Sequence, residues 1–316
     1  MPKILISDKY AQEGIDMLTS HEGFEVDIKT GMSPEELKGC IFEYDALLVR
    51  SATKPDKDII NAAKNLKLIV RGGEGTDNID KSSAAEKGIV VENTPGQNSH
   101  AVAELTVGLM FSLARHIPRA HSTTKQGMWE KKKLMGTELK GKILGLIGAG
   151  KIGRDVGSMA AALGMKVIAL GRKGICYEVI DGDIGLQRAS LDKILAQSDY
   201  ISIHVPLTDG TRNMIGAEAL AKMKPSAYIL NCARGGIIDE QALADAVNNG
   251  KIAGAAVDTY TKEPPAGDNP LIKCENIICI PHLGASSKEA QVNCAVAAAE
   301  QVIAYFDKDE VINKVN

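Results

Sequence analysis

The sequence lacks the features of a membrane protein or a nucleic-acid-binding protein. None of its apolar runs approaches the roughly 18 residues that a membrane-spanning helix requires. Its first residues, Met1–Asp8, are typical of a strand rather than of a signal peptide. With 37 basic and 40 acidic residues the net charge is −3, so nothing favours binding to nucleic acid or to an acidic membrane surface. We therefore expect a soluble, cytoplasmic protein.

Closely spaced cysteine pairs are also missing. The six cysteines form no C-x-x-C pair, and most stand in apolar segments. Such thiols are typical of the reduced interior of a cytosolic protein. The sequence therefore predicts neither disulfides nor a metal site.

What is present is an alternation of short apolar runs and helical patterns. At 316 residues, 44% of them hydrophobic, the chain suits two globular domains. This alternation predicts parallel sheets covered by helices on both faces, an α/β fold. The expected strands of the first half are Ile4–Ser7, Phe24–Ile28, Ala46–Arg50, Leu68–Arg71 and Ile89–Glu92. Those of the second half are Ile143–Ile147, Val167–Leu170, Tyr200–His204, Ala227–Asn231, Ile252–Val257 and Ile277–Ile280.

A dinucleotide fingerprint stands near the middle of the chain. The strand Ile143–Ile147 runs into Gly148-x-Gly150-x-x-Gly153, and a helix over residues 154–163 follows. In this context Gly148 permits a tight turn, Gly150 lets the backbone approach a pyrophosphate, and Gly153 lets the helix pack on the strand. The phosphates would lie at the helix N-terminus.

The position of the fingerprint predicts the domain order. A long apolar helix, Ser99–Arg115, precedes it, and an apolar helix over Ala290–Tyr305 follows the last strand. We expect that last helix to return to the first domain. The prediction is two doubly wound parallel-sheet domains, one of residues 1–98 and 288–316 and one of residues 99–287, with cofactor and substrate in the cleft between them.

Three strand ends in the second half carry side chains suited to oxidising an alcohol or reducing a ketone. Arg234 follows one strand and could hold a carboxylate in bidentate fashion. Asp258 and Glu263 follow the next, and His282 follows the last. Because ligands bind beyond the carboxyl ends of such strands, all three segments are expected to face one crevice.

The motifs together resemble the D-isomer-specific 2-hydroxyacid dehydrogenases over essentially the whole chain. Besides the fingerprint and the three strand ends, the resemblance is carried by Val49–Thr53, Gly75–Asp80, Asn93–Ser99 with Ala103-Glu104, Trp129–Leu139 and His204–Thr208. It implies a Rossmann domain inserted into a flavodoxin-like substrate-binding (lid) domain. The segment within Trp129–Leu139 is most similar to members that oxidise 3-phosphoglycerate to 3-phosphohydroxypyruvate in serine biosynthesis.

The resemblance implies a role for each residue. His282 would be the general acid/base, since imidazole exchanges protons near neutral pH. Glu263 would orient its ring, and Arg234 would bind the carboxylate and polarise the carbonyl. Asp258 would meet the nicotinamide carboxamide. The other expected cofactor contacts are Gly148, Gly150, Lys151, Ile152, Gly153, Gly171, Arg172, Val205, Pro206, Cys232, Ala233, Arg234, His282, Gly284 and Ala285.

The far end of the substrate is expected at the first domain. The resemblance implies that Arg50, Ser51, Gly73, Glu74 and Gly75, with Arg234 and His282, bind the substrate. One of the lysines 131–133 could reach a substrate phosphate, although a run of three lysines is more often a solvated face.

Two positions depart from the phosphoglycerate pattern. Glu74 stands where a small or hydroxyl residue is usual, and a carboxylate there would weaken the binding of a doubly anionic substrate unless it points away. After the strand ending at Leu170, the chain reads Gly171-Arg172 where NAD enzymes place an acid. The cofactor is therefore NAD(H) or NADP(H), with this pair favouring NADP(H).

Two alternatives to the phosphoglycerate reaction stay open. A glyoxylate/hydroxypyruvate or other 2-ketoacid reductase would use the same chemistry, and a dinucleotide-sensing corepressor could retain the same three residues. The Ser99–Arg115 helix and the segment around Trp129 suggest a homodimer. Since the chain ends at Asn316, we expect no C-terminal regulatory domain.

Overall fold

The chain divides into two compact units, which are described separately. Unit 1 comprises Met1–Asn98 and Ala285–Asn316, and unit 2 comprises Ser99–Gly284. The computed structural model describes residues 1–170 and 186–316. The predicted second boundary, after residue 287, differs from the observed one after Gly284. Two contacts connect the residues in between to the last helix. Ser287 is its N-cap, with Oγ accepting from the Ala290 N–H at 3.1 Å, and Gln291 Nε2 of the same helix donates to the Ala285 carbonyl at 2.7 Å.

Unit 1 contains a five-stranded parallel sheet. Its strands lie in the order β2-β1-β3-β4-β5, the flavodoxin-like arrangement. All five predicted strands are confirmed to within one residue at each end. Their bounds are β1 (Lys3–Ile6), β2 (Glu25–Ile28), β3 (Ala46–Val49), β4 (Leu68–Arg71) and β5 (Val90–Asn93).

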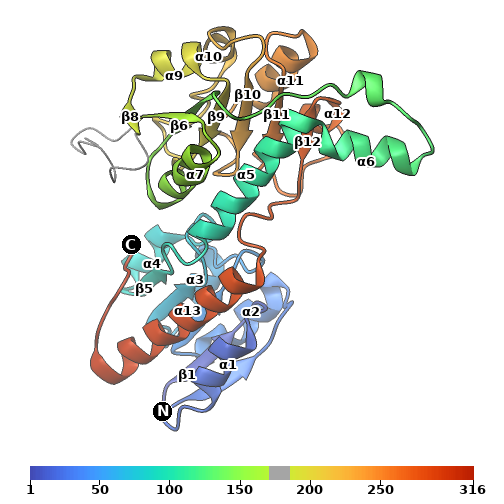
Figure 1. Ribbon diagram of the computed structural model, residues 1–316. Coiled ribbons are helices and arrows are strands. Elements are labelled where there is room, and N and C mark those ends of the chain that lie inside the picture. Colours follow the sequence, from blue (N-terminus) through green and yellow to red (C-terminus); the bar gives the residue numbers. More distant parts are fainter. Residues whose placement is uncertain (171–185) are drawn as a thin grey trace. The chain divides into compact units, whose positions relative to one another are not determined.

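Helices cover both faces of this sheet. Alternate strand residues point to opposite faces: Leu5, Leu47 and Ile69 pack against the helices of one face, while Ile4 and Leu48 pack against those of the other. α1 and α13 lie side by side on the second face (Figure 1). The helices of unit 1 are α1 (Gln12–Thr19), α2 (Pro34–Cys40), η1 (Ile41–Glu43), α3 (Lys57–Ala62), α4 (Lys81–Glu86) and α13 (Lys288–Lys308).

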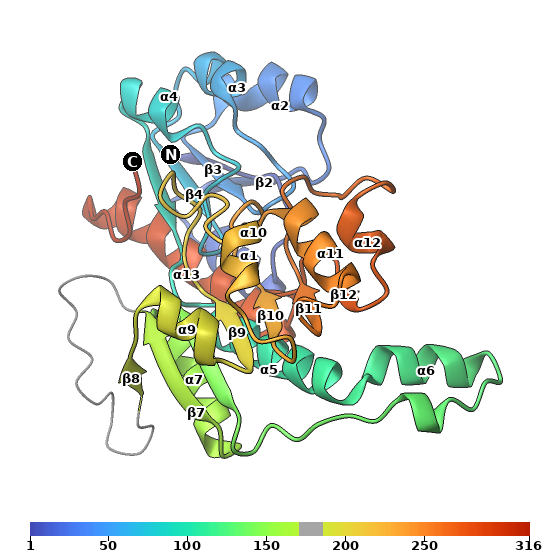
Figure 2. The same ribbon diagram turned by 90° about the horizontal axis from the view of Figure 1, so that it is seen from above.

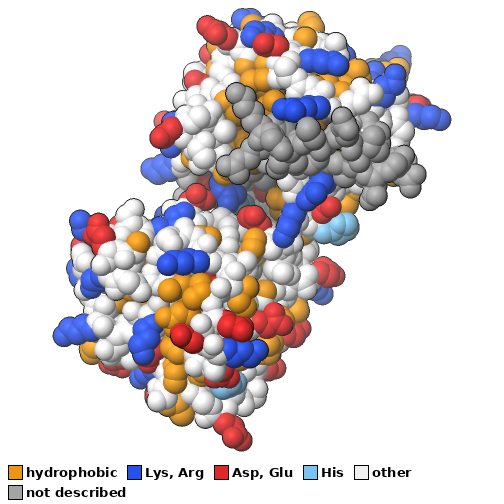
Figure 3. Space-filling view, turned by 90° about the vertical axis from the view of Figure 1, so that its left-hand side faces the viewer, with side chains coloured by type: hydrophobic (Ala, Val, Ile, Leu, Met, Phe, Trp, Pro, Cys, Tyr) orange, Lys and Arg blue, Asp and Glu red, His pale blue; other side chains and the backbone are white. Residues whose placement is uncertain are grey.

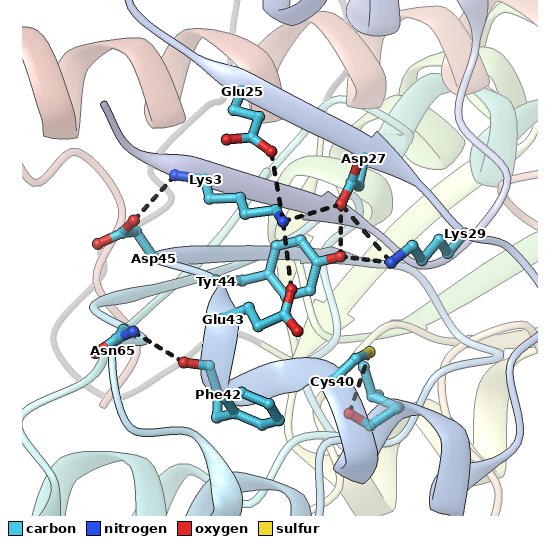
Figure 4. A network of polar contacts seen from close by, with 11 residues as sticks. Lys3, Glu25, Asp27, Lys29, Cys40, Phe42, Glu43, Tyr44, Asp45 and Asn65 are labelled. Atoms are coloured by element: carbon cyan, nitrogen blue, oxygen red, sulfur yellow. Dashed lines mark hydrogen bonds and ion pairs between the residues drawn. The ribbon is translucent and has the colours of Figure 1, made fainter.

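A polar network borders β2, the edge strand of unit 1. The Tyr44 hydroxyl donates to Asp27 at 2.7 Å and accepts from Lys29 Nζ at 2.8 Å. Lys3 Nζ lies 3.3 Å from Glu43 and 3.4 Å from Glu25 (Figure 4). The hydrogen bond from Tyr44 is the main cause that lowers the pKa of Asp27. These side-chain contacts tie β1 and β2 to the segment before β3.

Over its described residues, unit 2 contains a seven-stranded parallel sheet in the order β12-β11-β10-β9-β6-β7-β8. This is the Rossmann order: β7 and β8 follow β6 on one side, and β9, β10 and β11 follow it on the other. One further strand, β12, lies beyond β11. The sheet confirms the α/β, doubly wound fold class. The strands are β6 (Ile143–Ile147), β7 (Lys166–Leu170), β8 (Gln187–Arg188), β9 (Tyr200–Ile203), β10 (Tyr228–Asn231), β11 (Gly254–Val257) and β12 (Ile277–Cys279).

The helices of unit 2 also form two layers. On one face Leu144, Leu146 and Leu230 pack against α5 and α7, and on the other Ile201 and Ile229 pack against α9, α10 and α11. The helix bounds are α5 (Ser99–Arg115), α6 (Ile117–Lys125), η2 (Lys131–Lys133), α7 (Lys151–Ala162), α9 (Leu191–Gln197), α10 (Ala217–Ala221), α11 (Glu240–Asn248) and α12 (Pro270–Lys273). α6 and the segment after it project from the rest of unit 2 (Figure 2). No helix among the described residues is long and apolar enough to cross a membrane.

Charges are mixed on the surface. On the face shown in Figure 3, basic and acidic side chains are interspersed over the described residues. This distribution is what the nearly balanced numbers of basic and acidic residues lead one to expect.

Candidate active site

The glycine turn after β6 is built for close backbone contacts. Gly148 has φ +100°, and a Cβ there would lie 2.4 Å from the His204 carbonyl oxygen. A Cβ on Gly153 would lie 2.2 Å from the Gly148 carbonyl oxygen, so the turn and α7 touch directly. At Gly150, the residue that caps α7, a Cβ would meet nothing within 4 Å. The three glycines therefore fit a pyrophosphate group: two close the turn, and the third leaves the space through which phosphates approach the helix N-terminus.

His204 lies beneath this turn, at the end of β9. Its Nε2 is 2.9 Å from the Ser202 hydroxyl, and its buried Nδ1 has no hydrogen-bond partner among the described residues. Burial lowers the pKa of His204 to about 4. The imidazole is therefore neutral at physiological pH, which avoids placing an unpaired charge against the sheet.

The neutral His204 makes the stability of the protein sensitive to acid. In the unfolded chain its pKa is 6.5, above the folded value of about 4, so protons favour unfolding and stability is lost as the pH falls through this window. Between pH 7 and pH 5 we expect the protonation of this group to lower the free energy of unfolding by about 2 kcal/mol. Urea unfolding of wild type and His204→Gln at both pH values measures it. An equal loss in the variant would contradict this origin.

The three predicted strand ends of unit 2 come together. β10, β11 and β12 are neighbours in the sheet, and their register pairs Asn231 with Val257 and Val257 with Cys279. The residues that follow these ends therefore leave the sheet at the same edge. At Gly235 a Cβ would lie 2.0 Å from the main-chain carbonyl of Tyr260, so the loop after Arg234 packs directly on the loop after β11.

His282 and Glu263 form a hydrogen-bonded pair. His282 Nδ1 lies 2.7 Å from Glu263 Oε2, although the two residues are 19 positions apart in the chain. The other carboxylate oxygen, Oε1, accepts from the Tyr260 N–H at 3.1 Å. The two side chains are 46% and 38% exposed, respectively, and so can be reached by a ligand. With Nδ1 engaged by the carboxylate, Nε2 is the ring nitrogen that remains to exchange a proton.

Arg234 is held at the end of β10 by main-chain contacts. Its Nη1 donates to the Ala233 carbonyl at 2.7 Å, and its own carbonyl accepts from Asn231 Nδ2 at 2.9 Å. The Asn231 side chain also accepts from the Ala233 N–H at 3.1 Å. Asn231 thus fixes the turn that carries Arg234, a role that the sequence did not indicate.

Asp258 makes contacts that the sequence could not predict. It is fully buried, and its two carboxylate oxygens accept from the Leu283 and Gly284 N–H groups at 2.6 and 2.8 Å. Burial raises the pKa of Asp258, while the two hydrogen bonds oppose that rise. A contact of Asp258 with a nicotinamide carboxamide stays a prediction; in this structure its carboxylate holds the loop that follows His282.

The remaining predicted cofactor residues of unit 2 lie close to these strand ends. Val205 and Pro206 follow β9, directly after His204, and Cys232 and Ala233 follow β10. Burial raises the pKa of the Cys232 thiol to about 12, so it stays protonated. Gly171 and Arg172 lie outside the described residues. Ala285 belongs to unit 1.

The predicted substrate residues of unit 1 gather at the ends of β3 and β4. Arg50 follows Val49, the residue paired with Arg71 in the sheet. The Arg50 N–H donates to Asp8 at 2.5 Å, and its Nη1 contacts Gln291 of α13, a partner that the sequence did not indicate. Gly73 has φ +151°, and a Cβ there would lie 2.3 Å from Arg71 Nη1. The Arg71 guanidinium thus lies directly against the loop 72–75.

The Glu74 carboxylate is bound within unit 1. Its Oε2 accepts from the Gly96 N–H at 2.7 Å, and its main-chain carbonyl accepts from Asn93 Nδ2 at 2.6 Å. These bonds fasten the predicted substrate loop to the segment that follows β5. They direct the carboxylate toward Gly96, which reduces the charge repulsion expected if it faced an anion.

The lysine run lies on the projecting part of unit 2. Lys131, Lys132 and Lys133 form η2, and Lys133 Nζ pairs with Glu130 at 2.8 Å. All three lysines are exposed. Among the described residues, no group of three or more histidine, cysteine or acidic residues is arranged to hold a metal ion.

Comparisons with known proteins agree with this geometry. Residues 107–284 match the family model described as D-isomer specific 2-hydroxyacid dehydrogenase, NAD binding domain. The chain is 45% identical over 314 residues to a D-3-phosphoglycerate dehydrogenase of Archaeoglobus fulgidus, covering 99% of this chain and 59% of that protein. It is also 45% identical over 304 residues to a hydroxypyruvate reductase of Thermotoga maritima, covering 95% of this chain and 97% of that protein.

A solved structure shares the fold. An acyclic imino acid reductase (Bsp5), in complex with NADPH and D-Arg, superimposes with a TM-score of 0.87 at 29% identity, covering 99% of this chain and all of that one. The chain spans only 54–60% of the length of the first D-3-phosphoglycerate dehydrogenases that it resembles.

Proposed function

This chain belongs to the D-isomer specific 2-hydroxyacid dehydrogenase family, and from that premise we propose that it oxidises 3-phosphoglycerate to 3-phosphohydroxypyruvate with NAD(P), the D-3-phosphoglycerate dehydrogenase reaction of serine biosynthesis. The observation that supports the proposal most is the His282–Glu263 pair, whose Nδ1 and Oε2 atoms lie 2.7 Å apart; the two residues and Arg234 follow three neighbouring strands of one parallel sheet. The resemblance to enzymes of that name supports the choice of substrate.

Each residue has a definite task in this reaction. A bound nicotinamide supplies the acceptor for the hydride that leaves C2 of the substrate. His282 takes the hydroxyl proton at Nε2, and Glu263 stabilises the resulting imidazolium through Nδ1. Arg234 binds the substrate carboxylate and, in the reverse direction, polarises the carbonyl.

The cofactor would be held by the glycine turn. Gly148, Gly150 and Gly153 shape it, Lys151 and Ile152 open the helix, and the residues after β9 and β10 line the nicotinamide half. The preference between NAD(H) and NADP(H) rests on Gly171-Arg172, and we propose that NADP(H) is accepted. A preference for NAD of about a hundredfold in kcat/KM would contradict this.

The residues of unit 1 would bind the far end of the substrate. Arg50 and the loop 73–75 supply guanidinium and main-chain groups suited to a carboxylate or phosphate. A contribution from Lys131 or Lys132 is part of the same proposal. Lys133 is the weakest candidate of the three, because it is already paired with Glu130.

A hydroxypyruvate or glyoxylate reductase is the second candidate. It is favoured by the hydroxypyruvate reductase of Thermotoga maritima, which this chain matches over 97% of that protein's length.

A substrate panel tests the proposed function. Initial rates are measured with NAD and with NADP for 3-phosphoglycerate and D-lactate, and with NADH and NADPH for hydroxypyruvate and glyoxylate. We expect the highest kcat/KM with 3-phosphoglycerate. Turnover of hydroxypyruvate or glyoxylate alone would identify the second candidate, and no turnover at all would favour the dinucleotide-sensing corepressor.

We also propose that the chain forms a homodimer through the projecting part of unit 2. Trp129 and Met135 are 83% and 84% exposed there, and Ile117 and Met128 are also exposed. Large apolar side chains grouped in this way are typical of surfaces that another protein covers. Sedimentation should give twice the chain mass of 33.6 kDa; a monomer at micromolar concentration would contradict the proposal.

We further propose a cytoplasmic location. The described cysteines Cys40, Cys232, Cys274, Cys279 and Cys294 are free thiols, as is typical of proteins in a reducing compartment. Fractionation of the source cells tests this, and recovery from an extracytoplasmic fraction would overturn it.

A further inference from the structure

Tyr260 contacts Glu263 and the turn that presents His282. It is the third residue after β11 and is 6% exposed. Its N–H donates to Glu263 Oε1 at 3.1 Å, and its hydroxyl donates to the Ile280 carbonyl at 3.0 Å. Burial raises the pKa of the Tyr260 hydroxyl, so it stays protonated and able to donate.

The Ile280 carbonyl is part of the turn that presents His282. The His282 N–H donates to the same carbonyl at 3.2 Å, and His282 itself has φ +53°, in the left-handed region. For a residue other than glycine this conformation costs free energy and persists only where the surroundings fix it. Through its bond to the Ile280 carbonyl, Tyr260 fixes the residue that precedes the Pro281-His282 turn.

The other side of the turn is fixed by the same segment of chain. Asp258 accepts from the Leu283 and Gly284 N–H groups, and Glu263 holds the imidazole ring. Three residues that follow β11 thus hold the loop that carries His282. Tyr260 holds it before His282, Glu263 holds the imidazole itself, and Asp258 holds the two residues after it. The loop after Arg234 completes the assembly, because Gly235 packs against the Tyr260 main chain.

We propose that Tyr260 is a positioning residue for catalysis: its hydroxyl fixes the left-handed turn of His282, and its N–H fixes the Glu263 carboxylate. This rests on the proposed function of His282 as the acid/base. Proton transfer depends on accurate placement of the ring, so loosening the turn should slow the chemical step and leave the binding of ligands unchanged.

The test compares Tyr260→Phe, which removes only the hydroxyl, with Tyr228→Phe, a matched tyrosine of unit 2 at the start of β10. We expect kcat of Tyr260→Phe to fall about three- to tenfold, as for the loss of one hydrogen bond. The KM of the substrate and the Kd of NADH should stay within about twofold of wild type. An unchanged kcat, or a matching loss of NADH affinity, would overturn the proposal.

A second measurement needs no turnover. The imidazole N–H proton of His282 in its bond to Glu263 should give a downfield NMR signal, identified by its loss in His282→Gln. We expect this signal in wild type and in Tyr228→Phe. In Tyr260→Phe, at a temperature where the variant is still folded, the signal should be broadened or missing. An unchanged signal in Tyr260→Phe would overturn the proposal. If wild type turns over no substrate, the proposed function fails while this readout still tests the role of Tyr260.

Discussion

Replacing His282 by glutamine should lower kcat by about a thousandfold, the typical contribution of a general acid/base. The glutamine amide can still donate and accept hydrogen bonds, but it cannot take the substrate's proton. The Kd of NADH should change far less than kcat, by less than about tenfold, because the glycine turn expected to hold the pyrophosphate lies at a different strand end. Steady-state rates and NADH fluorescence measure the two quantities.

The chain provides a close control for this variant. His100 lies on α5 and, like His282, faces a glutamate: its Nε2 is 3.4 Å from Glu104. His100→Gln removes an exposed histidine–glutamate pair of the same unit and should keep wild-type kcat. A loss of less than about tenfold in His282→Gln would show that another group moves the proton.

Replacing Gly153 by alanine should raise the Kd of NADH about a hundredfold. A Cβ at this position would lie 2.2 Å from the Gly148 carbonyl oxygen, a backbone atom that cannot rotate away as a side chain can. The turn must therefore shift relative to α7, so that the N–H groups at the helix N-terminus no longer meet the phosphates in the arrangement that the fingerprint provides. Isothermal titration with NADH measures the effect.

Gly108→Ala is the matched control. Gly108 also lies inside a helix of unit 2, α5, but a Cβ there would meet nothing within 4 Å. This variant should bind NADH like wild type, with a Tm equal or slightly higher, because alanine favours the helix. If both variants bind NADH normally, the glycine turn is not the phosphate site.

The fold could be predicted because its signals are local. The strands of the parallel sheets are buried on both faces and appear as short apolar runs. The start of α2 is equally local: Ser33 and Glu36 have the spacing of a capping box, and both of its hydrogen bonds are present in the structure. The two-residue strand β8 was missed because Gln187 and Arg188 are polar and exposed and give no apolar signal.

The residues of the candidate site could be predicted from the sequence, but the groups that hold these residues in place could not. Chemistry-bearing side chains after strand ends are visible in the sequence, whereas the groups that hold them depend on side-chain to main-chain bonds. Asp258, Asn231 and Tyr260 all act in this way. No sequence pattern encodes which N–H or carbonyl lies opposite such a side chain once the chain has folded.

Contacts between segments far apart in the chain could also not be predicted from the sequence. Arg50 contacts Gln291, 241 residues away in the chain. Glu92, buried in β5, accepts from the Ile312 and Asn313 N–H groups and ties the end of the chain to the sheet edge. An acid inside an apolar strand is unusual, and its partner could be known only from the fold.

We propose that unit 2 transfers a hydride from the C2 carbon of a D-2-hydroxy acid to the nicotinamide, and this step can be observed directly. It is tested most directly with 3-phosphoglycerate deuterated at C2 and oxidised NAD or NADP, followed by mass spectrometry of the reduced cofactor. Wild type and His100→Gln should give one deuterium in each reduced cofactor, and His282→Gln should give almost no product. Reduced cofactor formed without deuterium would contradict direct hydride transfer from that carbon.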